Sequence, residues 1–353
     1  MSIYWNERIR NVEPYVPGEQ PKEEGLIKLN TNENPYPPSP RALEAMRAAL
    51  SGDMRLYPDP DAERLRGAVA AYYGVDPAEV FVGNGSDEVL ALAFLAFFDR
   101  DKPVRFPDVT YSFYPVYANM FGVPYQLVEL DSEFRLAADS FDGGQGGIVL
   151  ANPNAPTGIC VGLEQIDAWL AKHRDAVFVL DEAYVDFGGE TAVPLVRKHP
   201  HLLVVQTLSK SRSLAGLRVG FAIGHRDLIE GLNRAKHSFN SYTLDRVALA
   251  GAEAALNDRD YFEQTRSRVI ATRERTAAEL RARGFRLTDS KANFLFASHP
   301  EYEADKLFRQ LREKRVLVRY FAKPKIDGYL RISVGTDDQM DAFLAALDDI
   351  MRR

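Results

Sequence analysis

The chain has 353 residues, of which 46% are hydrophobic and 27% are charged, and its formal net charge is -6. This length predicts one large and one smaller domain, and the composition is typical of a globular protein with a sizeable core. The negative charge argues against nucleic acid as the main partner, because surfaces that bind nucleic acid are basic.

Several other classes of protein are disfavoured. The single cysteine, Cys160, excludes an intrachain disulfide and favours a reducing cytoplasm. Residues 1–25 lack the apolar core of a signal peptide, and the longest apolar run, at 89–98, is too short to cross a bilayer. The six histidines show no spacing typical of metal ligands. We therefore expect a cytoplasmic protein with no membrane segment and no metal.

The N-terminal 40 residues are rich in Pro, Asn and Glu. This composition predicts an extended arm with turns, and we expect the arm (1–40) to join the smaller domain. A helix is predicted next, with Ser39 as its N-cap and Pro40 at its first position. A second, amphipathic helix is predicted to end at Gly74.

Short apolar runs then alternate with helical patterns. Strands are expected at 79–83, 103–107, 146–152, 176–184 and 201–210, and helices at 86–98, 111–122 and 163–173. Strands that are apolar on both faces predict a mostly parallel sheet sandwiched by helices. The expected class is therefore α/β, with a large domain over residues 41–245.

The remaining residues predict a smaller α+β domain over 246–353. Residues 245–283 are charged and helix-prone, and they are expected to leave the large domain. Strand and helix patterns follow at 285–298, 304–321 and 328–336, and the chain ends in a predicted helix at 337–352.

Two of the expected strand ends carry groups that could bind a ligand. Asp181 directly follows an apolar run, so its carboxylate needs a cationic or hydrogen-bonding partner. The turn at Gly85, Ser86 and Asp87 opens a helix, where backbone N–H groups can bind an anion. Glu88 stands where a dinucleotide fingerprint needs its third glycine. Alone, each feature is also compatible with a helix cap or an ordinary turn.

Lys210 gives these features a common explanation. It lies among serines at a strand-to-loop junction, with Arg218 eight residues downstream, and a lysine in such a place can form a Schiff base. Pyridoxal 5'-phosphate carries an aldehyde for the lysine, a pyridine nitrogen for Asp181 and a phosphate for the turn and Arg218. One ligand therefore accounts for three separate features.

Seven motifs in order carry a resemblance that covers the chain from about residue 26 to its end. They are NENPYPP (32–38), YPDP (57–60), GNGSDE (83–88), NPNAPTG (152–158), DEAYVDF (181–187), TLSKSRSLAGLRVGF (207–221) and YLRISVGT (329–336). In these motifs the chain resembles the fold-type I, pyridoxal-phosphate-dependent aminotransferases, and among them most closely the histidinol-phosphate aminotransferase family.

The resemblance implies roles at the cofactor ring. Lys210 would be the Schiff-base lysine and would move the proton between Cα and C4'. Asp181 would keep the pyridine nitrogen protonated. Tyr184 would hydrogen-bond the phenolic oxygen, and Tyr111 would stack on the ring. The family usually has asparagine at the position of Ala155, so either Asn154 or Asn152 would replace it at the phenolic oxygen, or Tyr184 would hold that oxygen alone, and Asn154 is carried over only as a weaker candidate.

The resemblance also implies how the phosphate and the substrate are bound. Ser209, Arg218 and the backbone of residues 85–87 would hold the phosphate. Tyr57 would reach it from the neighbouring subunit, which implies a homodimer with shared active sites. The substrate residues would be Arg331 and Arg319 for its anionic end, with Tyr15 and Asn34 closing over it.

The implied reaction is transamination between L-histidinol phosphate and 2-oxoglutarate, which yields glutamate, in histidine biosynthesis. Two alternatives share the fold: an aromatic amino-acid aminotransferase and a decarboxylase of a phosphorylated amino acid. A dinucleotide-dependent oxidoreductase is a third, but it lacks its fingerprint and leaves Lys210 without a role.

Overall fold

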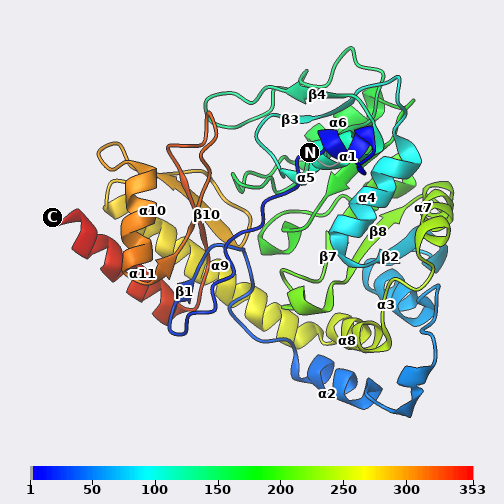
Figure 1. Ribbon diagram of the computed structural model, residues 1–353, viewed down its shortest axis with the longest axis horizontal. Coiled ribbons are helices and arrows are strands. Elements are labelled where there is room, and N and C mark those ends of the chain that lie inside the picture. Colours follow the sequence, from blue (N-terminus) through cyan, green and yellow to red (C-terminus); the bar gives the residue numbers. More distant parts are fainter. Residues whose placement is uncertain (1–2, 353) are drawn as a thin grey trace.

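A seven-stranded sheet forms the centre of the computed structural model, which describes residues 3–352 (Figure 1). The strand order is β2-β8-β7-β6-β5-β3-β4. The strands from β7 to β4 run parallel, whereas β8 is antiparallel to both of its neighbours, so the predicted mostly parallel sheet is confirmed. The strand bounds are β2 Val80–Gly83, β3 Val104–Pro107, β4 Tyr125–Val128, β5 Ile148–Ala151, β6 Phe178–Asp181, β7 Leu202–Thr207 and β8 Gly220–Gly224.

Helices cover both faces of this sheet. Successive strand residues point to opposite faces, and the structure accordingly has two apolar clusters. Phe178 and Leu180 lie in one cluster, with residues of α3, α6 and α8, while Val179 lies in the other, with residues of α4, α5 and α7. The helix bounds are α2 Pro40–Ala49, α3 Glu63–Tyr73, α4 Gly85–Phe97, α5 Phe113–Phe121, α6 Leu163–Lys172, α7 Arg226–Phe239 and α8 Arg246–Asn257.

The predicted helix ends are confirmed. The Ser39 side chain accepts a hydrogen bond from the backbone N–H of Ala42, and Pro40 opens α2. Gly74 ends α3 in the left-handed conformation, which glycine adopts without steric cost. Five 3₁₀ turns connect the longer elements: η1 Gly52–Arg55, η2 Pro77–Glu79, η3 Val185–Phe187, η4 Val193–Arg197 and η5 Ala215–Leu217.

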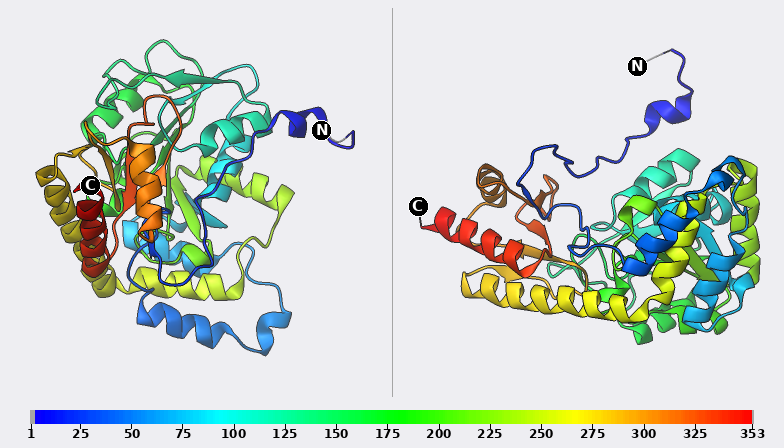
Figure 2. Two further views of the ribbon diagram at one scale, coloured as in Figure 1. Left: turned by 60° about the vertical axis from the view of Figure 1, so that its left-hand side comes forward. Right: turned by 90° about the horizontal axis from the view of Figure 1, so that it is seen from below.

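The C-terminal part is built on a separate antiparallel sheet. Its strand order is β12-β13-β10-β9, and its helices pack around a third apolar cluster (Figure 2). A short N-terminal strand, β1 (Ile27–Lys28), pairs in parallel with β11 (Val316–Leu317). The remaining bounds are β9 Arg286–Leu287, β10 Phe294–Ser298, β12 Arg319–Tyr320, β13 Leu330–Ser333, α9 Arg259–Ala282, α10 Ala304–Glu313 and α11 Asp337–Met351.

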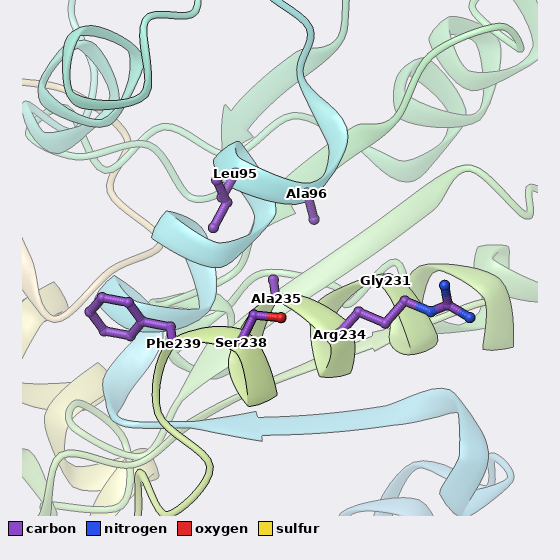
Figure 3. Close-up of a pocket in the computed structure, with 7 residues that line it drawn as sticks. All are labelled: Leu95, Ala96, Gly231, Arg234, Ala235, Ser238 and Phe239. Atoms are coloured by element: carbon purple, nitrogen blue, oxygen red, sulfur yellow. The ribbon is translucent and has the colours of Figure 1, made fainter.

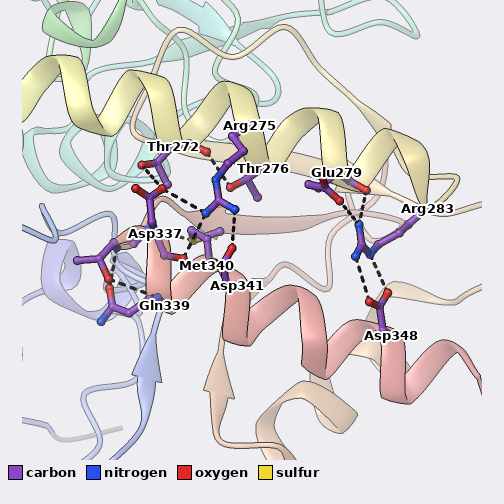
Figure 4. A network of polar contacts seen from close by, with 12 residues as sticks. Thr272, Arg275, Thr276, Glu279, Arg283, Asp337, Gln339, Met340, Asp341 and Asp348 are labelled. Atoms are coloured by element: carbon purple, nitrogen blue, oxygen red, sulfur yellow. Dashed lines mark hydrogen bonds and ion pairs between the residues drawn. The ribbon is translucent and has the colours of Figure 1, made fainter.

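Ion pairs fasten α11 along α9 (Figure 4). Arg283, the C-cap of α9, pairs with Asp348 at 2.7 Å, and Arg275 of α9 pairs with Asp337 at 3.2 Å and with Asp341 at 2.5 Å. The same helix also contacts α8 beside the central sheet and β9 and β10 of the smaller sheet, so α9 packs against both parts of the fold. The domain boundaries after residues 40 and 245 stay a prediction.

Two local features differ from the sequence predictions, one in the arm and one at the edge of the central sheet. The N-terminal arm contains a short helix, α1 (Glu7–Asn11), which is capped by the Asn6 side chain. The edge strand β4 has mostly exposed residues, so it lacks the apolar run that marks the other strands. Residues 198–201 form a turn at the surface, in which Lys198 is exposed while His199 is buried and hydrogen-bonds Asp167 at 2.6 Å.

Within residues 3–352, no helix is apolar and long enough to cross a bilayer, and no group of three or more His, Cys, Asp or Glu side chains is arranged to hold a metal ion. Figure 3 shows a surface pocket between α4 and α7, lined by Leu95, Gly231 and Phe239 among others. Leu95 is near the C-terminal end of α4, ten residues or about 15 Å from the anion-binding turn at its N-terminus.

Candidate active site

Several of the predicted cofactor-binding residues lie at one edge of the central sheet. Strands β2, β6 and β7 point the same way, so their carboxyl ends share this edge, and β8 begins there. Gly83 at the end of β2 and Thr207 at the end of β7 are both paired with Gly220. Asp181 is the last residue of β6. Ligands of parallel α/β sheets bind at this edge.

An anion cradle lies where α4 begins. Arg218 has a left-handed backbone, with φ of 55°, and its Nη2 lies 2.9 Å from Asp87 Oδ2. Its Nη1 lies 3.4 Å from Ser209 Oγ. The side chain of the N-cap residue Asn84 makes no capping hydrogen bond to α4, which leaves backbone N–H groups of the first turn available beside the guanidinium. The arrangement suits a phosphate.

Gly220 is required for this cradle, because a Cβ there would lie less than 3.0 Å from the backbone of Gly85 and Ser86. We expect Gly220→Ala to destabilise the protein by roughly 2–4 kcal/mol, since backbone atoms cannot move aside as a side chain can. Urea unfolding measures the change. Gly216→Ala is the matched control, because nothing lies within 4 Å of the Cβ it would add. Equal stability of the two variants would contradict the close packing.

Asp181 is buried, with 5% of its surface exposed. Its Oδ2 accepts a hydrogen bond from the Tyr114 hydroxyl at 2.8 Å, and its Oδ1 accepts one from the backbone N–H of Ala183 at 3.2 Å. Burial raises the pKa of Asp181 to about 6, although both hydrogen bonds oppose the shift. The hydrogen-bond partners are uncharged, so the carboxylate suits an added cationic group.

Lys210 lies beyond β7, between the arm and Tyr184. Its Nζ lies 3.4 Å from the carbonyl oxygen of Thr31 and 5.7 Å from the centre of the Tyr184 ring. The side-chain amide of Asn34 donates to the carbonyls of Lys210 at 3.0 Å and Ser211 at 3.3 Å. Asn34 thereby holds the lysine loop, and its role over the substrate stays a prediction.

Aromatic side chains from the arm and from the large sheet meet beside the cradle. The Tyr111 hydroxyl donates to Asp87 Oδ1 at 2.8 Å, and burial raises the pKa of Tyr111 well above its usual range. Tyr15 stacks on Phe113, with ring centres 4.3 Å apart, and lies 6.2 Å from the Tyr111 ring. The arm therefore extends over the large sheet's side of the site.

Two arginines lie side by side on neighbouring strands of the smaller sheet. Arg319 and Arg331 are directly paired on β12 and β13, and both guanidinium groups lie near Phe321, at 5.3 and 5.4 Å. Like charges directly opposite one another are destabilising without an anion between them. Arg331 donates to the carbonyl of Asn30 at 3.0 Å, while its buried Nε has no hydrogen-bond partner within residues 3–352. The pair suits an anionic ligand.

Two predicted residues have other contacts in the structure. Asn154 donates its two amide hydrogens to Val109 O at 2.9 Å and Thr157 Oγ1 at 3.1 Å. Its role toward a cofactor stays a prediction. Tyr57 is 76% exposed and stacks on Tyr242, with ring centres 4.5 Å apart, so in this chain it is turned toward solvent.

The sequence reasoning did not single out Asn32. Its side-chain amide donates to the Tyr184 hydroxyl at 3.0 Å, and its backbone is left-handed, with φ of 56°. The only sequence signal was its position at the start of the NENPYPP motif, since asparagine tolerates this conformation better than most residues.

A lysine, a buried carboxylate and an anion cradle at one sheet edge are what an aminotransferase of this architecture requires. A model of the family "Aminotransferase class I and II" matches residues 24–347, and the chain belongs to this family. The predicted fold-type I architecture is confirmed.

The similar proteins are more specific. A histidinol-phosphate aminotransferase of Aromatoleum aromaticum is 56% identical over 100% of both chains. Histidinol-phosphate aminotransferase 1 of Bordetella parapertussis is 58% identical over 99% of both. The solved structure of histidinol-phosphate aminotransferase from Sinorhizobium meliloti in complex with pyridoxal-5'-phosphate has a TM-score of 0.88 and 24% identity, covering 100% of this chain and 98% of that one. At that identity, the likeness concerns the fold.

Proposed function

We propose that this chain is a pyridoxal-phosphate-dependent aminotransferase that moves the amino group of L-histidinol phosphate to 2-oxoglutarate, forming glutamate, in histidine biosynthesis. One observation supports the assignment to the aminotransferases: Lys210, buried Asp181 and the Arg218 anion cradle all lie at the same edge of the central sheet. The choice of substrate is supported by the full-length similarity to histidinol-phosphate aminotransferases.

The residues present fit pyridoxal phosphate. The cofactor supplies an aldehyde that takes up the substrate amine and a ring that accepts electrons from it. Arg218, Ser209 and the start of α4 would hold its phosphate, and Asp181, whose polar contacts are uncharged, would pair with the ring nitrogen. The Tyr184 hydroxyl would donate a hydrogen bond to the phenolic oxygen. Tyr111, with Tyr15 behind it, would cover the ring.

Lys210 performs the proton transfer in this proposal. Its Nζ would attach the cofactor in the resting enzyme and, once the substrate amine has replaced it, take the proton from the substrate's Cα. A positioned general base of this kind contributes roughly 10²–10⁴-fold to the rate. The Asn34 amide, bonded to the carbonyls of Lys210 and Ser211, fixes the loop that carries the lysine.

Arg319 and Arg331 would bind the substrate's anionic end. The phosphate of histidinol phosphate and a carboxylate of 2-oxoglutarate or glutamate both match a guanidinium fork. One arginine pair can therefore serve both half-reactions. Tyr15 and Asn34 of the arm would enclose the substrate, because the arm crosses from Arg319, which donates to the carbonyl of Val16, toward Phe113.

A comparison of substrates tests the proposal. We expect kcat/KM for L-histidinol phosphate to exceed that for phenylalanine or tyrosine by at least about tenfold to a hundredfold, since one charge-assisted contact contributes about 1.5–3 kcal/mol. The acceptor is 2-oxoglutarate in each assay. Equal or better turnover of an aromatic amino acid would instead support the aromatic aminotransferase, and release of carbon dioxide from a phosphorylated amino acid would support the decarboxylase.

The active form would be a cytoplasmic homodimer. Tyr57 and its neighbour Tyr242 lie with Leu56 and Phe239 among the exposed large hydrophobic residues, and Phe239 is 80% exposed. Tyr57 and Tyr242 stack on one another, which makes part of this apolar surface continuous. A second subunit would cover it and receive Tyr57 at its phosphate cradle. The single cysteine fits a reducing compartment.

Mixed subunits test whether the sites are shared. Lys210→Ala and Tyr57→Ala homodimers should each have low activity. When they are mixed one to one and allowed to exchange, about half the dimers are hybrids, and one of their two sites is intact, so about a quarter of wild-type activity should return. Activity that stays at the mean of the two parents, or a fully active monomer, would rule out sharing.

A further inference from the structure

Asn32 lies between the smaller sheet and Tyr184, and all of its polar groups are engaged. Its backbone N–H donates to Ser333 Oγ at 2.8 Å, and its backbone carbonyl accepts from the Asn293 side chain at 2.9 Å. Its Oδ1 accepts from Ser333 Oγ at 3.0 Å, and its Nδ2 donates to the Tyr184 hydroxyl at 3.0 Å. The residue itself is buried.

Ser333 determines which way the Asn32 amide faces. Ser333 Oγ accepts the backbone N–H of Asn32, and its own proton is satisfied by Asn32 Oδ1. If the amide were reversed, this oxygen would receive two N–H groups and its proton would lose that acceptor. The amide NH₂ therefore faces Tyr184, whose oxygen accepts one hydrogen bond and whose own proton remains to be donated.

The Tyr184 ring is fixed on its other sides by apolar residues. It meets Phe294 edge-on, with ring centres 5.1 Å apart, and packs against buried Ala155 and Ala292. The position of the ring thus comes from packing, whereas the direction of the hydroxyl proton comes from the Asn32 amide. The Lys210 ammonium lies 5.7 Å from the same ring.

We propose that Asn32 is a positioning residue that orients the Tyr184 hydroxyl as a hydrogen-bond donor to the phenolic oxygen of the cofactor. This role rests on the proposed function. It also connects the two halves of the site, because Ser333 lies two residues beyond Arg331 on β13 and Arg331 donates to the carbonyl of Asn30. The strand that carries the substrate arginine therefore also sets the direction of the Tyr184 proton.

Asn32→Gly is the sharpest variant, because glycine keeps the left-handed backbone at no steric cost and removes the amide. Asn32→Asp keeps the shape and removes the donor. A donor to the phenolic oxygen stabilises its negative charge, so losing the donor should raise the pH midpoint of the bound cofactor's visible absorption band. We expect a rise of about one pH unit, a tenfold change in proton affinity. Tyr184→Phe should give a similar rise, and the Asn32→Gly/Tyr184→Phe double variant no further rise.

A second measurement uses the protein without cofactor. In samples labelled with ¹³C at tyrosine Cζ, the Tyr184 signal, assigned by its absence from Tyr184→Phe, should move in Asn32→Gly and Asn32→Asp. Asn30→Ala is the matched control, because it removes a neighbouring amide that donates to the carbonyl of Glu19 instead of to Tyr184. It should leave both the signal and the midpoint in place.

The outcomes separate this inference from the proposed function. A protein that takes up pyridoxal phosphate but whose midpoint is the same in wild type and Asn32→Gly would overturn the role of Asn32 alone. Shifts that add fully in the double variant would do the same, since they would not pass through Tyr184. A protein that forms no visible band with added pyridoxal phosphate would overturn both.

Discussion

Lys210→Ala is expected to lose at least about 10³–10⁴-fold of the wild-type kcat/KM while the fold survives. Removing Nζ takes away both the covalent attachment and the proton-transferring base, each of which accelerates such reactions substantially. The fold should persist because the loop is held through the backbone carbonyls of Lys210 and Ser211, which Asn34 binds irrespective of the side chain. Steady-state kinetics and thermal unfolding of the same samples measure the two effects.

Chemical labelling identifies the lysine directly. Borohydride reduction of the wild-type enzyme with its cofactor should fix the pyridoxyl group on the peptide that contains Lys210, and the visible band should disappear. Lys210→Arg keeps the positive charge but lacks the primary amine, so it is the control for electrostatic effects. Label on a different lysine, or near-normal turnover by Lys210→Ala, would refute the assignment.

The sequence predicted the central sheet well because its strands are buried on both faces. β6 and β7 contribute alternate residues to two separate apolar clusters, so each is a continuous apolar run. Edge strand β4 could not be recognised in this way, since Tyr125 and Leu127 are exposed at the edge of the sheet. The Ser39 and Gly74 helix ends were predictable because each depends on local chemistry.

The residues of the candidate site also differ in whether local sequence patterns reveal them. Lys210 and Asp181 could be selected because Asp181 ends a strand and Lys210 lies three residues beyond one, and parallel topology brings strand ends together. Asn32 could not, because its contacts join residues 152 and 301 positions apart in the chain. A pattern along the sequence cannot show that the arm bends back onto β13 and meets Tyr184 there. Likewise, sequence alone could not show that Asn154 donates one amide hydrogen to Thr157 in its own turn and the other to the distant carbonyl of Val109.

Asp181→Asn is expected to have opposite effects on activity and on stability. The pKa of Asp181 is raised to about 6 by burial, from 3.8, so the ionised carboxylate destabilises the folded, cofactor-free protein. The group's contribution to stability therefore falls as pH rises from about 4 to about 6, and at pH 8 the cost is about 2–3 kcal/mol. The amide can still accept from the Ala183 N–H and donate to the Tyr114 oxygen, so cofactor-free Asp181→Asn should be more stable than wild type at pH 8 by up to this amount. The two proteins should converge near pH 4.

Activity should change in the other direction. A neutral amide cannot hold the ring nitrogen of the cofactor protonated, and breaking a buried ion pair costs about 3–5 kcal/mol, or roughly 10²–10⁴-fold in kcat/KM. Urea unfolding of cofactor-free samples at pH 4, 6 and 8, with kinetics at pH 8, would measure both effects. Asp186→Asn is a useful control, because Asp186 is a nearby carboxylate that binds Ser211 at 2.5 Å instead of facing the cofactor. If Asp181→Asn were no more stable at pH 8 and nearly fully active, the buried carboxylate would be a structural group. It would then not be the partner of the cofactor's ring nitrogen.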